Sequence, residues 1–206
     1  MSVFDKFLKK CSKGHLIGIG GVSMSPLAEV LHDAGLEITG SDIAESERTS
    51  NLRGKGIEIF IGHDASNITP DTQFVVRTAA AHDDNPEIIR AYELGIPVFE
   101  RTQAWGAIMK GYKNALCISG THGKTTTTSM CTHILMAAEK DPTVMIGGTL
   151  PLLQAGHRVG NGDTIVMESC EYYNSFLQFY PTVAVILNIE SDHLDFFSGI
   201  EDIKKS

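Results

Sequence analysis

The chain of 206 residues is 42% hydrophobic and 20% charged, an ordinary composition for a soluble globular protein of one large domain or two smaller ones. Its 17 basic and 25 acidic residues give a net charge of −8, which argues against a nucleic-acid-binding protein. No apolar run approaches the ~20 residues of a membrane helix and the N-terminus lacks the apolar core of a signal peptide, so we expect a cytoplasmic protein without a membrane partner.

Short apolar runs alternate with helical patterns in the first half of the chain, after N-terminal residues with the pattern of a short amphipathic helix. This alternation predicts a parallel sheet with helices between its strands. We expect Ser25 to cap a first helix, with Pro26 at its first position and Gly35 as its stop; a second helix starts at Asn85 and stops at Gly95. The expected strands are residues 15–19, 36–39, 57–61, 74–76 and 96–99.

A second α/β unit is predicted after a connecting helix over residues 102–110. Its main helix is expected over residues 127–139, and its apolar side chains Met130, Ile134 and Leu135 predict that this face packs inward. The expected strands of this unit are residues 115–119, 144–146, 164–167 and 183–187.

The pattern divides the chain into two domains, residues 1–110 and 111–206. Residues 199–206 have the pattern of a helix that is just starting, and a phosphate-loop domain normally needs more strands than remain. We therefore interpret the chain as a piece of a longer protein. Its four cysteines form no C-x-x-C pair, so we expect buried free thiols and no zinc site.

A glycine-rich segment, Gly18 to Ser25, follows the first expected strand and precedes the first helix. Glycines at such a turn let the backbone approach a pyrophosphate at the helix N-terminus, and Asp42 ends the second strand as in dinucleotide sites. The third glycine of that fingerprint is replaced by Ser23. Three interpretations therefore stay open: a tight turn without a ligand, a nicotinamide or flavin dinucleotide, and another diphosphate such as a UDP-sugar.

A second glycine-rich loop, G-T-H-G-K-T-T at residues 120–126, lies between an apolar strand and a helix. Its backbone N–H groups, the helix N-terminus and Lys124 can together hold phosphate oxygens, and the Thr125 hydroxyl can reach a phosphate-bound Mg²⁺. The usual first glycine of a phosphate loop is Ile118 here, so the match is to a shorter variant. We predict an ATP site formed by Gly120, Thr121, His122, Gly123, Lys124, Thr125 and Thr126.

Polar side chains follow two further strands of the second unit. Glu171 lies just past the strand 164–167, where a parallel sheet beside a phosphate loop places a second Mg²⁺ ligand. His193 lies in the segment 188–195 after the last strand, where Asp and His side chains can bind a metal or orient water. The alternatives are a solvated carboxylate for Glu171 and a capped turn for 188–195.

Taken together, these segments resemble the Mur ligase family of bacterial cell-wall synthesis over nearly the whole chain. The matching segments are H-L-I-G-I-G-G-V-S-M-S at 15–25, G-S-D at 40–42, N-P-E at 85–87, G-T-H-G-K-T-T-T-T-S-M at 120–130 and N-I-E-S-D-H-L-D at 188–195. The resemblance implies a Rossmann-like domain for a UDP-sugar, then a central P-loop domain for ATP, of which this chain would contain the N-terminal portion, then a C-terminal domain.

The implied activity is the ATP-dependent ligation of L-alanine to UDP-N-acetylmuramate through an acyl phosphate, with this piece inactive alone. By the resemblance, Lys124 holds the β- and γ-phosphates, Thr125 and Glu171 bind one Mg²⁺, and His193 binds another. Lys124, Glu171 and His193 would thus be the catalytic residues. The implied UDP-sugar site comprises Gly18, Gly20, Gly21, Val22, Ser23, Met24, Ser25, Asp42, His63 and Thr78.

Two departures from the family pattern affect what the resemblance implies. Many relatives have Asp-Glu-Ser-Asp where this chain has Cys170-Glu171-Tyr172-Tyr173, so only the glutamate is kept, and Ser23 replaces a common glycine. Two other functions remain as alternatives: a murein peptide ligase, which attaches a recycled peptide, and a nicotinamide-dependent oxidoreductase that uses the first glycine segment. The sequence leaves the oligomeric state open.

Overall fold

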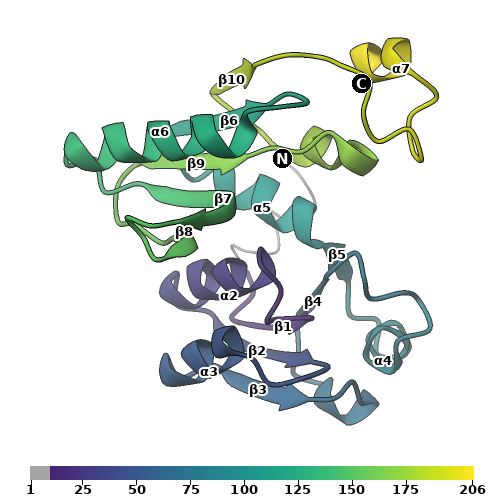
Figure 1. Cartoon of the computed structure of the whole chain (residues 1–206). Helices are drawn as coiled ribbons and strands as arrows, with labels where there is room; N and C mark the ends of the chain where they lie inside the picture. Colours follow the sequence, from purple (N-terminus) through teal and green to yellow (C-terminus); the bar gives the residue numbers. More distant parts are fainter. Residues whose placement is uncertain (1–9) are drawn as a thin grey trace. The chain divides into compact units, whose positions relative to one another are not determined.

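The protein is described by a computed structural model for residues 10–206. The chain forms two compact units, one ending at Ala104 and the other starting at Trp105, and each is built on a five-stranded sheet with helices (Figure 1). This confirms the expected α/β architecture. The predicted N-terminal amphipathic helix falls largely outside the described residues, and Lys13–Ile17 at its end form the first strand.

All five strands of the first unit are parallel, in the order β3-β2-β1-β4-β5. Helices α2 and α3 lie on one side of this sheet and α4 on the other (Figure 1). The strands are β1 (Lys13–Ile17), β2 (Glu37–Asp42), β3 (Glu58–Ile61), β4 (Phe74–Arg77) and β5 (Val98–Glu100). The helices are α2 (Met24–Asp33), α3 (Glu47–Gly54), the short η1 (Ala65–Asn67) and α4 (Pro86–Glu93), with α5 (Arg101–Met109) leading to the second unit.

Chain connections leave β1 and β4 in opposite directions along the sheet, because β2 and β3 lie beyond β1 and β5 lies beyond β4. The loops after β1 and β4 therefore diverge at the carboxyl ends of two neighbouring strands. Open parallel sheets bind ligands in the crevice that forms at such a switch point. The fold thus places the first glycine segment at the expected position for a ligand.

Helix α2 begins earlier than the sequence predicts. Ser23 occupies the N-cap position and Ser25 lies inside the helix, so the prediction of Ser25 as the cap was wrong. Gly35 follows the end of α2 with φ +88°, as expected for a glycine that stops a helix. Helix α3 was not predicted, because its buried residues are only Thr49 and Leu52; the cap at Ser46 was its available signal.

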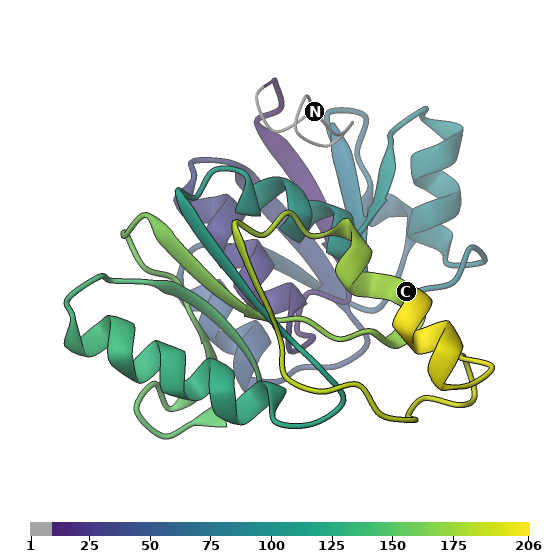
Figure 2. The same ribbon diagram turned by 90° about the horizontal axis from the view of Figure 1, so that it is seen from above.

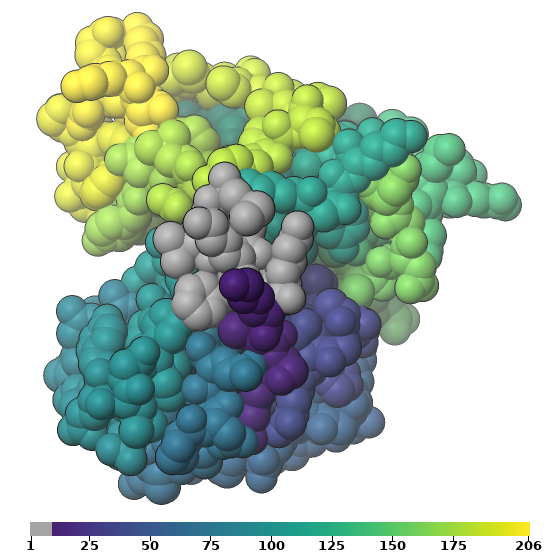
Figure 3. Space-filling model, turned by 180° about the vertical axis from the view of Figure 1, so that it is seen from behind, coloured from purple at the N-terminus to yellow at the C-terminus, as the bar shows by residue number. Residues whose placement is uncertain are grey.

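The second unit has the strand order β10-β6-β9-β7-β8. Its strands are β6 (Asn114–Ser119), β7 (Thr143–Leu150), β8 (Ala155–Arg158), β9 (Thr164–Glu168) and β10 (Val183–Ile186). Its helices are α6 (Lys124–Ala137), η2 (Tyr172–Gln178) and α7 (Ile200–Lys205). The β7–β8 pair is antiparallel, and β8 is the strand of this sheet that the sequence did not predict. Figure 3 shows α7 in yellow on the surface of this unit.

Helix α6 runs along the second sheet and packs on β6, β7 and β9 (Figures 1 and 2). The side chains that it buries are Thr128 and Thr132, whereas Met130 and Ile134 are 59% and 65% exposed. The predicted inward face of this helix was therefore wrong. The Thr132 hydroxyl donates to the Thr128 carbonyl at 2.8 Å, so it can be buried without losing a hydrogen bond.

Within residues 10–206, no helix combines the length and the apolar character that crossing a membrane requires. The four cysteines all lie in this part of the chain and are free thiols, as expected, but only Cys117 is buried and the other three are partly exposed. Burial raises the pKa of the Cys117 and Cys170 thiols, so both favour the protonated form in the absence of a metal.

Candidate nucleotide-binding sites

A cavity of about 630 Å³ lies at the switch point of the first sheet. It is bordered by the loops that follow β1, β2, β3 and β4. Its lining includes six of the predicted UDP-sugar residues: Gly18, Gly20, Gly21, Asp42, His63 and Thr78. The lining also includes residues that the sequence analysis did not select, among them Glu45, Ser46, His82 and Asn85.

The loop after β1 is held close to the end of β2. The amides of Gly18 and Ile19 donate to the Ser41 carbonyl at 2.8 and 2.9 Å, and the amide of Gly20 donates to Asp42 Oδ2 at 2.7 Å. Gly18 has φ +77°, and a Cβ there would lie 2.6 Å from the Thr78 side chain, so the position requires glycine. The Asp42 side chain, at the end of β2, therefore holds the glycine loop in its conformation.

Four predicted residues of this loop, Val22, Ser23, Met24 and Ser25, do not line the cavity. Because α2 starts at Met24, the amides of Met24 and Ser25 both donate to the Gly21 carbonyl at 3.0 Å. Their side chains are buried, whereas that of Val22 is exposed. The Ser23 hydroxyl accepts a hydrogen bond from Arg101 at 2.5 Å.

A buried carboxylate, Glu87, lies at the centre of a hydrogen-bond network next to this cavity. Ser41 Oγ donates to Glu87 Oε2 at 2.6 Å, and Asn67 Nδ2 donates to Oε1 at 2.7 Å. His63 Nδ1 is 3.0 Å from Oε2, and His15 Nε2 is 3.5 Å from Oε1. Burial acts to raise the pKa of Glu87, but the hydrogen bonds and charge of its partners outweigh burial and hold that pKa below its ordinary value.

The network also selects the tautomer of a neutral His63 ring. An ionised Glu87 can only accept hydrogen bonds, so the proton of the neutral imidazole stays on Nδ1. This leaves Nε2 of His63, a residue that lines the cavity, as a hydrogen-bond acceptor for a ligand. The sequence identified His63 only by resemblance, and its carboxylate partner Glu87 was not selected.

In the second unit, residues 120–123 connect β6 to the N-terminus of α6. Gly123 has φ +84° at the N-cap, and a Cβ on Gly120 would lie 3.1 Å from backbone atoms of Asn188. The His122 amide donates to Asn188 Oδ1 at 2.9 Å, and Asn188 Nδ2 donates back to the His122 carbonyl at 3.0 Å. The segment after β10 thus fixes the outer side of the loop.

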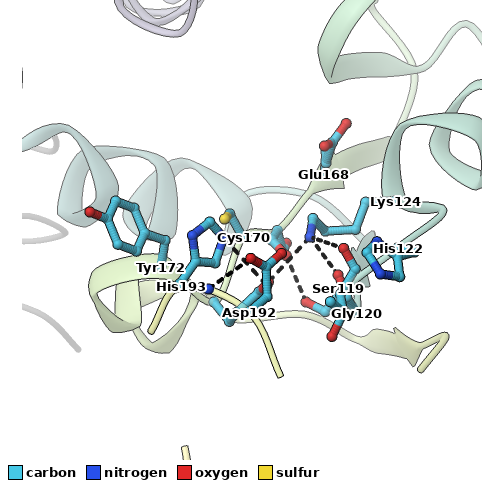
Figure 4. Close-up of polar contacts among 12 residues, drawn as sticks. Ser119, Gly120, His122, Lys124, Glu168, Cys170, Tyr172, Asp192 and His193 are labelled. Carbon is cyan, nitrogen blue, oxygen red and sulfur yellow. Dashed lines mark hydrogen bonds and ion pairs between the residues drawn. The ribbon is translucent and has the colours of Figure 1, made fainter. Parts of the chain in front are cut away.

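The N-terminal end of α6 offers the groups of an anion site. The amides of Lys124, Thr125 and Thr126 precede the first intrahelical bond, which runs from Thr127 N to Gly123 O, so the helix provides no acceptor for them. Lys124 Nζ donates to the carbonyls of Gly120 at 2.5 Å and Thr121 at 3.1 Å. The structure therefore holds the ammonium group folded back onto its own loop (Figure 4).

Two carboxylates, one at the carboxyl end of β9 and one in the segment that follows it, flank Lys124 and Thr125. Glu171 Oε2 is 3.3 Å from Lys124 Nζ. The Thr125 hydroxyl donates to Glu168, at 2.9 Å from Oε2, and the Gly147 amide donates to that same oxygen at 2.7 Å. The sequence selected Glu171, but Glu168 is the carboxylate that contacts Thr125. Its position at the carboxyl end of β9 was the available signal.

The predicted metal residues Glu171 and His193 lie together, with His193 Nε2 at 3.7 Å from Glu171 Oε1. Glu171 is only 8% exposed, and its Oε1 has no hydrogen-bond partner among the described residues. Cys170 joins them, because the three ligand atoms lie within 4.8 Å of one another. Thr125, the third predicted metal residue, contacts Glu168 instead of this group. The side chain of His122, which was predicted to belong to the ATP site, is exposed.

Two family models match the chain: "Mur ligase family, catalytic domain" over residues 13–113 and "Mur ligase middle domain" over residues 118–206. The UDP-N-acetylmuramate–L-alanine ligase of Clostridium novyi (strain NT) is 51% identical over 97% of this chain and 44% of its own length. That of Clostridium perfringens (strain 13 / Type A) is 49% identical over 98% of this chain and 44% of its own length. The chain thus spans less than half of these relatives.

Solved structures of related ligases share the fold. The UDP-N-acetylmuramate-alanine ligase of Thermotoga maritima is 37% identical with a TM-score of 0.83, over 94% of this chain and 45% of that one. The UDP-N-acetylmuramate:L-alanyl-gamma-D-glutamyl-meso-diaminopimelate ligase of Neisseria meningitides is 27% identical with a TM-score of 0.83, over 95% of this chain and 66% of that one. Both sheets of this chain therefore occur in known ligases.

Proposed function

Because the chain belongs to the Mur ligase family, we propose that it serves the ATP-dependent ligation of L-alanine to UDP-N-acetylmuramate in peptidoglycan precursor synthesis. The observation that carries this proposal is the presence, on one chain, of a switch-point cavity and a separate phosphate loop bordered by Lys124 and Glu171. Two nucleotide sites suit a reaction in which ATP, bound at one site, activates the carboxylate of a UDP-sugar bound at the other. We place the reaction in the cytoplasm, because the four cysteines are free thiols and the cytoplasm keeps thiols reduced.

The first unit is proposed to bind the UDP-sugar. Its glycine loop, Gly18 to Gly21, borders the cavity closely enough for the diphosphate to approach the backbone. His63 Nε2 is an acceptor for a uracil or ribose N–H or O–H group, and Thr78 borders the same cavity. Asp42 acts by holding the loop through the Gly20 amide.

The second unit is proposed to bind the phosphates of ATP. When ATP binds, the β- and γ-phosphates replace the loop carbonyls as partners of Lys124 Nζ, and the first-turn amides of α6 complete the site. The buried Oε1 of Glu171 and the nearby His193 imidazole fit a divalent cation. Glu171 and His193 are thus proposed Mg²⁺ residues, and Thr125, whose hydroxyl contacts Glu168, is proposed to turn to a phosphate-bound Mg²⁺ when ATP binds. Mg²⁺ there would neutralise phosphate charge.

The reaction follows from these two bound substrates. A carboxylate oxygen of the muramate lactyl group attacks the γ-phosphorus, the bond to ADP breaks, and an acyl phosphate forms. The amine of L-alanine then attacks the acyl carbon, phosphate leaves, and the amine proton is released. Lys124 stabilises the charge on the transferring phosphoryl group, and the two sites supply alignment without a covalent enzyme intermediate.

A murein peptide ligase is the second candidate, because the Neisseria meningitides structure matches with the same TM-score as the alanine ligase of Thermotoga maritima. The higher identity to alanine ligases, 51% for that of Clostridium novyi, favours L-alanine as the amine. An assay of the full-length protein with L-alanine and with the tripeptide as competing amines separates the two. We expect amide formation with L-alanine only.

Binding of UDP-N-acetylmuramate is the direct test of the first site. We expect the 206-residue chain to bind UDP-N-acetylmuramate in a calorimetric titration and to show no heat of binding with NAD. UDP alone should bind more weakly than the UDP-sugar, because it leaves the sugar side of the cavity unfilled. Tight NAD binding without UDP-sugar binding would replace the ligase proposal by that of an oxidoreductase.

The change Asp42→Ala is expected to weaken UDP-sugar binding about tenfold or more. It removes the acceptor of the Gly20 and Ile43 amides, and each hydrogen bond to a charged group contributes about 1.5–3 kcal/mol to the stability of the loop conformation. The matched control is Asp33→Ala, which removes an exposed carboxylate at the end of α2. Equal affinities of the two variants for UDP-N-acetylmuramate would contradict the role of Asp42.

A further inference from the structure

The group formed by Cys170, Glu171 and His193 has a donor set that differs from a magnesium site. Their ligand atoms lie within 4.8 Å of one another, and Figure 4 shows the sulfur of Cys170 beside the ring of His193. Mg²⁺ takes oxygen ligands, whereas a thiolate, an imidazole and a carboxylate together suit Zn²⁺, Co²⁺ or Cd²⁺. A metal site of this kind would depart from the sequence expectation that the chain has no zinc site.

One pair of the donors already has nearly the spacing of ligands on a bound zinc ion, and the whole set, within 4.8 Å, needs side-chain movement to close on a metal. Metal bonds of about 2.0–2.3 Å in a tetrahedral site place the donor atoms about 3.3–3.6 Å apart. The 3.7 Å between His193 Nε2 and Glu171 Oε1 nearly meets this value already. Glu171 Oε1 is also buried without a hydrogen-bond partner among the described residues, as expected for an atom that awaits a cation.

The imidazole of His193 is held in position by its neighbours. The ring of Tyr172 stacks on it at a centroid distance of 4.5 Å and an interplanar angle of 24°. The Tyr172 hydroxyl in turn donates to Asp195 Oδ2 at 2.5 Å, and the His193 amide donates to Asp192 Oδ1 at 2.7 Å. Such supporting contacts orient a metal ligand before the metal arrives.

We propose that Cys170, Glu171 and His193 form a binding site for a thiolate-binding divalent metal ion such as Zn²⁺, with the thiolate of Cys170 as the selective ligand. Three protein ligands leave one tetrahedral position open to water or a phosphate oxygen. Because Glu171 and His193 are also the proposed Mg²⁺ residues, Zn²⁺ is expected to compete with Mg²⁺·ATP. This competition rests on the proposed function; the metal site does not.

The absorption spectrum of added Co²⁺ tests whether the sulfur of Cys170 binds the metal. We expect Co²⁺ to give the 206-residue chain a thiolate-to-metal charge-transfer band that Cys170→Ser abolishes. In calorimetry, Zn²⁺ should bind Cys170→Ser at least about tenfold more weakly than the unchanged chain. The matched control, Cys131→Ser, removes a half-buried thiol on α6 and should keep both the band and the affinity. Circular dichroism checks that each variant is folded.

Two outcomes overturn the site: a charge-transfer band that survives in Cys170→Ser, and equal Zn²⁺ affinity of that variant and the unchanged chain. The competition is tested by titrating ATP with Mg²⁺ in the presence of Zn²⁺, where weaker ATP binding is expected and unchanged binding overturns it. Failure of ATP·Mg²⁺ binding in buffer freed of transition metals before Mg²⁺ is added concerns only the proposed function, because the cobalt spectrum is recorded without nucleotide.

Discussion

Replacement of Lys124 by methionine is expected to reduce ATP·Mg²⁺ binding by the 206-residue chain about 100-fold or more. Lys124 Nζ binds the carbonyls of Gly120 and Thr121 in the loop that precedes α6, where phosphate oxygens would replace them. Each hydrogen bond to a charged group contributes about 1.5–3 kcal/mol, and two phosphate contacts would be lost. Calorimetric titration with ATP and Mg²⁺ measures the change.

The matched control for this variant is Lys140→Met, which removes the same charge from an exposed position past the end of α6 in the same unit. It should bind ATP·Mg²⁺ like the unchanged chain. Lys124→Met also leaves the buried Glu171 without its ammonium partner, so its thermal unfolding should be recorded to confirm that the variant is folded. A folded Lys124→Met variant with unchanged ATP affinity would contradict the phosphate-loop assignment.

Replacement of Glu87 by alanine is expected to lower the free energy of unfolding of the first unit by about 3–5 kcal/mol. The side chain is fully buried, and its removal leaves donors of Ser41, Asn67 and His63 without their acceptor. UDP-N-acetylmuramate binding should fall as well, because His63 loses the contact that fixes its tautomer. Denaturant unfolding and calorimetry measure the two effects.

Glu93→Ala is the control, because Glu93 lies exposed on the same helix and forms only a surface pair with Arg90. Its effect should stay below about 1 kcal/mol. If Glu87→Ala does not fold, Glu87→Gln keeps the shape of the side chain and still removes the charge. A loss of stability equal to that of Glu93→Ala would contradict the central role of Glu87.

The pH dependence of this stabilisation has a defined sign. The pKa of Glu87 in the folded protein lies below its ordinary value of 4.5. The folded state therefore binds the proton less readily than the unfolded state, and the contribution is complete above pH 4.5 and lost as the pH falls through the folded pKa. Glu87→Gln should flatten the decline of stability below pH 4.5 relative to the unchanged chain.

Local signals in the sequence were sufficient for the parallel strands and for the order of strand, glycine loop and helix in both units. Helix α4 begins after Asn85 and ends before Gly95, as predicted. Both signals are local, because the N-cap side chain and the glycine with left-handed backbone angles act within a few residues. The inward face of α6 was wrong because small threonines, Thr128 and Thr132, pack against the sheet. Hydrophobic periodicity cannot identify a face that packs through threonine.

Contacts between residues far apart in the chain could not be predicted from local sequence patterns. Glu87 meets His63 and Ser41 only because β2, β3 and α4 meet at one end of the sheet. Thr125 contacts Glu168 for the same reason, through the neighbouring strands β6 and β9. Residue types and strand ends indicated where polar groups gather, but their pairing depends on register.

The central claim is that two nucleotide sites cooperate to form an acyl phosphate on the muramate carboxylate. Its most direct test is a ligase assay of the full-length protein with ATP, L-alanine and UDP-N-acetylmuramate labelled with heavy oxygen in the lactyl carboxylate. Mass spectrometry of the released inorganic phosphate should find one labelled oxygen per molecule. Unlabelled phosphate, or label recovered in AMP, would contradict the account.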